Sequence, residues 1–184
     1  RIAGEDFIKG AAPRQISLIG SWLVNEENGT ITLGFADSGM KIALFGVDIL
    51  DLSVRDRVRE YFHTVNHEYC HIVNQKKPYS DEFAKITPSG YTAVWNNHTD
   101  AEALQLGFIS AYARANNIED FAEMTAHMLI MGKTAWDTKI NAITSATGKE
   151  ALRKKEAFVV NYFKSEWNID FYELQAEVQR KIQQ

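Results

Sequence analysis

The chain has 184 residues, of which 45% are hydrophobic and 24% are charged, so we expect a single compact domain over residues 1–184. Its formal net charge is −4 and lysines and arginines do not cluster with aromatic residues, so nucleic-acid binding has no electrostatic support. No apolar run is long enough to cross a membrane. The single cysteine, Cys70, excludes an internal disulfide.

Residues 1–52 are expected to form mainly strands, although the segment up to about Gly10 has no clear pattern. Residues 15–24 are rich in apolar side chains, residues 30–35 alternate polar and apolar, and residues 40–45 are again mostly apolar. Turn-forming residues separate these runs. The pattern predicts an antiparallel meander, followed by a last strand or the approach to a helix.

Residues 53–77 have the apolar periodicity of a helix, with Ser53 at the N-cap position. Within it, residues 67–71 read H-E-Y-C-H, an H-E-x-x-H motif. Histidines four residues apart share one face of a helix and can bind one metal ion, for which zinc is well suited. Glu68 projects to the side and can take a proton from a metal-bound water. His67, His71 and Glu68 therefore predict the site of a zinc peptidase.

Three nearby side chains are not expected to bind this metal. Cys70 is about 100° around the helix from His71 and is interpreted as a small buried hydrophobe. His63 is about 12 Å in rise from His71, which is too far for one zinc ion. His127 is expected to pair with Glu123 or with solvent.

Residues 78–116 lack periodicity but contain prolines, glycines and recurring aromatic residues. A loop of this length is usually functional or disordered, and its aromatic residues favour an ordered loop that covers the site. Trp95 and His98 are candidate substrate-binding residues within it.

The third metal ligand has to come from elsewhere in the chain, because Asn74 and Lys77 exclude the metzincin continuation of the motif. Residues 117–132 predict a second apolar helix with Glu119 and Glu123 on one face. A metal would resolve the repulsion between the two carboxylates, with one as ligand and the other hydrogen-bonded to a ligand histidine. The residues alone leave open which carboxylate does which, and a solvated acidic first turn is the alternative.

These motifs together resemble the gluzincin-type peptidases. The chain is most similar to the zinc-binding metallopeptidase lipoproteins found beside glycan-uptake transporters of gut Gram-negative bacteria. More distantly, it is similar to the catalytic domains of lethal-factor-type toxins. The resemblance rests on the H-E-x-x-H motif and the E-D-F-A-E run at 119–123, with softer support from W-N-N-H-T-D at 95–100 and G-F-I-S-A-Y at 107–112.

The resemblance implies one zinc ion per chain, held by His67, His71 and Glu119. It implies Glu123 behind the ligands and Tyr112 as the phenol that stabilises the oxyanion. The predicted reaction is hydrolysis of a peptide bond by an endopeptidase, with a peptide, protein or glycoprotein as substrate. The implied location is the periplasm or the outer-membrane surface of a Gram-negative bacterium, through a lipid anchor preceding Arg1.

Residues 117–184 are expected to be helical, with a short mixed segment at 135–143, a helix from Thr147 and an amphipathic helix after Asn168. The sequence thus predicts an α+β, zincin-like fold: a small antiparallel or mixed sheet, an active-site helix, a ligand helix and a helical C-terminal part. Two alternatives remain. One is a non-catalytic zinc-containing module that binds a peptide or glycoprotein. The other is a two-carboxylate site for another divalent metal.

Overall fold

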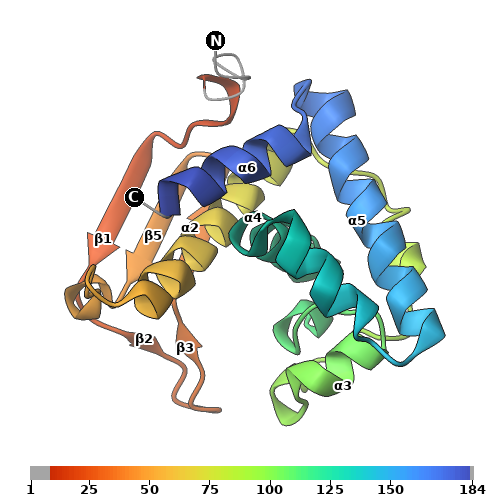
Figure 1. The fold of residues 1–184 in the computed structure, drawn as a ribbon. Helices are drawn as coiled ribbons and strands as arrows, with labels where there is room; N and C mark the ends of the chain where they lie inside the picture. The colour runs from red at the N-terminus through yellow and green to blue at the C-terminus, as the bar shows by residue number, and fades with distance from the viewer. Residues whose placement is uncertain (1–8, 183–184) are drawn as a thin grey trace.

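The computed structural model describes residues 9–182, and most of the unassigned segment up to Gly10 lies outside them. Strands in the first part of the chain are followed by helices (Figure 1), which confirms the predicted α+β class. The strands are β1 (Gln15–Ile19), β2 (Leu23–Val24), β3 (Ile31–Thr32), β4 (Gly34–Asp37) and β5 (Lys41–Phe45). The α-helices with assigned bounds are α2 (Arg55–Lys76), α3 (Asp100–Gln105), α4 (Asn117–Asn141), α5 (Ala146–Trp167) and α6 (Phe171–Ile182).

The strands form a mixed sheet and a separate ribbon. The sheet has the order β1-β5-β4, in which β5 is parallel to β1 and antiparallel to β4. β2 and β3 form a two-stranded antiparallel ribbon. The predicted meander was therefore wrong, because residues 15–24 are two strands and the chain passes through β2, β3 and β4 before β5 returns beside β1. Alternation of side chains locates strands but carries no information on which strand each one pairs with.

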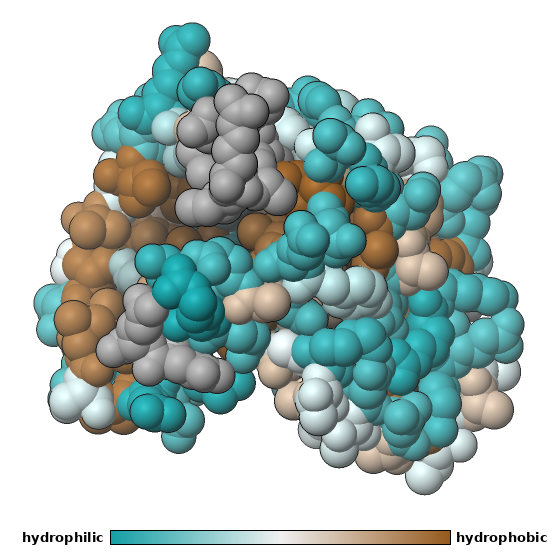
Figure 2. All heavy atoms as spheres, turned by 45° about the horizontal axis from the view of Figure 1, so that its top comes forward, coloured by the Kyte–Doolittle hydropathy of each residue, from teal (hydrophilic) through white to brown (hydrophobic). Residues whose placement is uncertain are grey.

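Helix α2 covers one face of the sheet. Ile42 and Leu44 of β5 are buried against Ile72 of α2. Figure 2 shows hydrophobic residues gathered on the side of the molecule where the strands lie. The large hydrophobic side chains exposed on the strands and the turns beside them include Ile16, Leu18, Trp22, Leu23, Val24, Ile31, Leu33 and Phe35.

Helix α2 begins slightly later than predicted. Its N-cap residue is Val54, which makes no side-chain capping hydrogen bond. The hydroxyl of Ser53, the predicted cap, instead donates to Asp51 Oδ1 at 2.6 Å, and the Ser53 backbone N–H donates to the same oxygen at 2.9 Å. This local turn uses the side chain that would otherwise have capped the helix. The segment before it contains a 3₁₀ turn, Val47–Ile49, and no strand.

Helix α4 is the centre of the helical part and packs against α2, α5 and α6. It spans Asn117–Asn141 as two helical stretches that meet at a kink at Gly132, where the backbone is non-helical with a φ of 73°. The first stretch therefore ends where the sequence predicted a helix end, and the second occupies much of the short mixed segment expected at 135–143. Helices α5 and α6 follow as predicted. No described helix is long and apolar enough to cross a membrane.

The long connection between α2 and α4 contains several short helical turns and some buried side chains. It contains the 3₁₀ turns Ala84–Ile86, Trp95–Asn97 and Tyr112–Arg114 as well as α3. Phe83 and Phe108 are fully buried, and the ring of Tyr79 stacks on Phe121 with centroids 4.2 Å apart. The aromatic residues near its start thus belong to the core, and the later part reaches the site described next.

Candidate metal centre

Helices α2 and α4 bring the predicted ligand side chains together. His67 and His71 project from α2, and Glu119 projects from the first turn of α4. The Nε2 atoms of His67 and His71 are 3.0 Å apart. Glu119 Oε2 lies 2.9 Å from His67 Nε2 and 3.3 Å from His71 Nε2. Ligand atoms around a tetrahedral zinc ion, with bonds near 2 Å, lie about 3.3 Å apart. The three residues fit zinc, and their role as ligands stays a prediction.

The electrostatics of this first cluster (His67, His71 and Glu119) also favour a cation. Burial lowers the pKa of His67, but hydrogen bonds to Glu119 and Glu123 outweigh burial and raise this pKa to about 10. Burial raises the pKa of Glu119, but His67 and His71 outweigh burial and hold this pKa well below its usual value. The carboxylates therefore create a negative potential at the imidazoles that attracts positive charge.

Glu123 lies on the other side of the His67 ring. Its Oε1 is 2.9 Å from His67 Nδ1, and its Oε2 accepts a hydrogen bond of 2.6 Å from Ser110 Oγ. A carboxylate in this position fixes the Nδ1–H tautomer and directs the Nε2 lone pair toward a metal. The distances favour Glu119 as ligand and Glu123 as the orienting residue. Sequence reasoning missed Ser110, since no local pattern connects it with a residue on the following helix.

Glu68 is buried beside the first cluster. Burial raises the pKa of its carboxyl group, and the nearby histidines oppose that rise. Its Oε2 is buried and has no hydrogen-bond partner among the described residues. A carboxylate with an unpaired oxygen and a raised pKa has the properties of a general base.

Strand β4 passes directly against Glu68. A Cβ atom added to Gly34 would lie only 2.7 Å from Glu68 Cγ. Only glycine allows the backbone to approach this closely, and a glycine inside a predicted strand was the sequence signal that could have identified the contact.

Tyr112 and Trp95 lie beside the first cluster, whereas His98 is turned elsewhere. The Tyr112 ring is 5.9 Å from that of His67, and the Trp95 ring contacts Tyr112 edge-on at 4.8 Å. Burial and the charge of Glu119 raise the pKa of Tyr112 above its usual value. His98 Nδ1 lies 3.9 Å from Glu102 Oε2. The catalytic and substrate-binding roles of these residues stay predictions.

A cleft of about 370 Å³ opens beside these residues. Its walls come from the turn and strands at 30–34, from α2 and from the later part of the long connection. The lining residues include Leu33, Gly34, His67, Glu68, Trp95, Tyr112 and Glu123. Among the described residues, strand β4 lies at one edge of its sheet, and its Gly34 lines the cleft together with Glu68.

Comparisons with known proteins agree with this geometry. The protein family described as "Putative zinc-binding metallo-peptidase" matches residues 1–172 of this chain. The fold is similar to the crystal structure of a putative zinc-binding metallo-peptidase from Bacteroides caccae, with 31% sequence identity and a TM-score of 0.78. The match covers 98% of this chain and 69% of that chain. No curated protein matches this sequence.

Proposed function

Because this chain belongs to the family of putative zinc-binding metallo-peptidases, we propose that it is a zinc-dependent endopeptidase. The observation that carries the proposal is the convergence of His67 Nε2, His71 Nε2 and Glu119 Oε2 beside the unpartnered oxygen of Glu68. The family that the motifs resemble is the family whose model matches this chain, so the predicted resemblance is confirmed.

The first cluster would hold one zinc ion. Zinc in such a site acts as a Lewis acid that polarises a peptide carbonyl and makes water a stronger acid. The protein's own contribution starts with Glu123, which accepts a hydrogen bond from His67 Nδ1 and keeps that ring in position. Ser110 in turn holds Glu123.

Glu68 moves the protons in the proposed reaction. It takes one proton from the attacking water and later delivers it to the leaving amine, and a raised carboxyl pKa suits both steps. Tyr112 donates its phenolic hydrogen to the carbonyl oxygen as that oxygen gains negative charge. Its raised pKa keeps the phenol protonated, as this role requires.

The proposed substrate is an extended segment of a peptide or protein, which would include a glycoprotein. The cleft is bordered by residues 30–34 and by edge strand β4. An extended chain can add to such an edge through backbone hydrogen bonds and so place one peptide bond beside Glu68. We also propose export to the periplasm or outer-membrane surface as a lipoprotein, which rests on the sequence resemblance alone.

The test is the variant Glu68→Gln, which keeps the size of the side chain and removes the base. We expect cleavage of a peptide library, followed by mass spectrometry, to fall at least about 10³-fold while bound zinc is unchanged. The matched control is Glu60→Gln on the same helix outside this cleft, which should retain activity. Full activity in Glu68→Gln would contradict the proposed base. A parent protein that binds zinc and cleaves no peptide would favour a binding module.

A further inference from the structure

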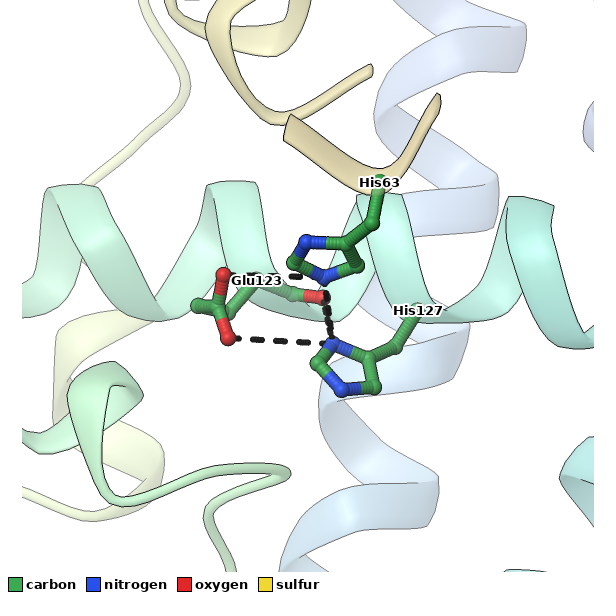
Figure 3. A group of neighbouring side chains, drawn as sticks. All are labelled: His63, Glu123 and His127. Carbon is green, nitrogen blue, oxygen red and sulfur yellow. Dashed lines mark hydrogen bonds and ion pairs between the residues drawn. The ribbon is translucent and has the colours of Figure 1, made fainter. Parts of the chain in front are cut away.

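A second group of side chains that could bind a metal ion includes Glu123 itself and lies next to the first cluster. His63 projects from α2, and Glu123 and His127 project from α4 (Figure 3). His63 Nε2 is 2.9 Å from His127 Nδ1. Glu123 Oε1 lies 3.6 Å from His63 Nε2, and Glu123 Oε2 lies 3.7 Å from His127 Nδ1. We propose that this second cluster binds a second divalent transition-metal ion, of which zinc is the expected example.

The two nitrogen atoms of the second cluster are spaced like those of the first, whereas its carboxylate oxygens are farther from the nitrogens, at 3.6 and 3.7 Å against 2.9 and 3.3 Å. The nitrogen atoms are 2.9 Å apart in the second cluster and 3.0 Å apart in the first. Both values are within about 0.5 Å of the separation expected around a tetrahedral zinc ion. Two imidazole nitrogens this close cannot both carry a hydrogen directed at the other, so they either share one proton or direct both lone pairs at one cation.

The donor set suits a transition metal. Two imidazoles and one carboxylate are ligands that zinc and its neighbours prefer, whereas magnesium and calcium prefer oxygen alone. Glu123 Oε1 and Oε2 already accept hydrogen bonds from His67 and Ser110, but each carboxylate oxygen has a further lone pair. His127 Nδ1 also lies 3.1 Å from the backbone oxygen of Glu123, so metal binding at Nδ1 would replace this contact and place the ring hydrogen on Nε2.

An ion could reach this cluster from solvent. The side chains of His63 and His127 are 25% and 22% exposed, and His63 and Glu123 line the cleft. The three protein ligands would leave a coordination position for water. Since the ligands come from two helices, the ion would connect α2 to α4.

The experiment counts zinc per chain after chelation, refilling and removal of excess ion, using elemental analysis. The parent should hold two zinc ions, while His71→Ala should lose the first and keep one. His127→Ala should lose the second and keep one, and the combined variant should hold none. The control His98→Ala, a histidine outside both clusters, should still hold two. Circular dichroism confirms that each variant is folded.

A measurement on the parent alone guards against variants that do not fold. Titration with Co²⁺ should give two saturating steps in visible absorbance, one for each cluster. One step, together with no zinc in His71→Ala, would overturn the second site and leave the proposed peptidase intact. One zinc in His71→Ala and none in His127→Ala would instead support the second site and contradict the first.

Discussion

Glu119 and Asp120 are neighbours on α4, yet they lie in opposite electrostatic settings. Glu119 faces the histidines of α2, whereas Asp120 faces α5, where its Oδ2 is 2.7 Å from Lys155 Nζ. The side chains of Asp120 and Lys155 are both 0% exposed. Tyr91 also donates to Asp120 Oδ2, and Lys155 donates to the backbone oxygen of Gly107. We call Asp120 and Lys155 the sealed pair.

The two carboxyl groups consequently have pKa values shifted in opposite directions. Burial raises the pKa of Asp120 to about 6, although Lys155 opposes the rise. The histidines overcome burial at Glu119 and lower its pKa. In this comparison, Glu119 faces two imidazoles that could also bind a cation, which is the role proposed above. A single lysine enclosed with its partner instead makes a closed structural contact.

The largest expected effect on stability comes from breaking the sealed pair. Lys155→Met should lower the free energy of unfolding by about 3–5 kcal/mol, because Asp120 would remain buried without its counter-charge. Urea denaturation in the presence of a chelator measures this change. The combined variant with Asp120→Asn should lose less than the sum of the two single variants.

The control for this prediction is the adjacent Lys154→Met, whose side chain is 62% exposed. It should change stability by less than about 0.5 kcal/mol. A Lys155→Met protein as stable as this control would show that the sealed pair contributes no net stability.

A smaller loss of stability is expected when the pH is lowered, because Glu123 becomes protonated. Burial raises the pKa of Glu123, but His67, His127 and His63 outweigh it and lower this pKa from 4.5 to about 2. A folded-state pKa below the unfolded value means that the stability contribution is complete above pH 4.5 and is lost as the pH falls toward 2. The loss should be roughly 3 kcal/mol in metal-free protein.

Urea denaturation at a series of pH values, with Glu123→Gln as the comparison, tests this sign. The variant should show a flatter dependence between pH 4.5 and 2. Asp120 should act in the opposite sense, since its raised pKa makes its contribution largest below pH 3.8 and lost as the pH rises through about 6. Parallel curves for the parent and Glu123→Gln would contradict the assignment.

The smallest effects should come from replacing two tyrosines, Tyr91 beside Asp120 and Tyr112 beside the first cluster. Tyr91→Phe removes a hydrogen bond to the buried Asp120 and should cost about 1–2 kcal/mol of stability with unchanged activity. Tyr112→Phe should leave stability nearly unchanged and lower kcat about 100-fold, or about 2.7 kcal/mol in the barrier. Thermal unfolding and steady-state kinetics on both variants make the comparison. If Tyr112→Phe keeps its kcat, Tyr112 packs beside the cleft without assisting the reaction.

The sequence alone determined the features that depend on one segment. The H-E-x-x-H spacing places His67 and His71 on one side of any regular helix, since helix geometry fixes the angle between residues four apart. The same rule puts Glu119 and Glu123 on one face and keeps His63 out of the first cluster. The periodicity of the C-terminal segments likewise predicted α5 and α6.

Only the tertiary structure decided the features that join distant segments. It set the parallel pairing of β1 with β5, the close approach of Gly34 to Glu68, and the contact of Ser110 with Glu123. It also turned Glu119 toward α2 and Asp120 toward α5, and brought His63 beside His127. These contacts depend on how whole helices and strands pack, and the free energy of that packing is shared among many residues that no local spacing connects.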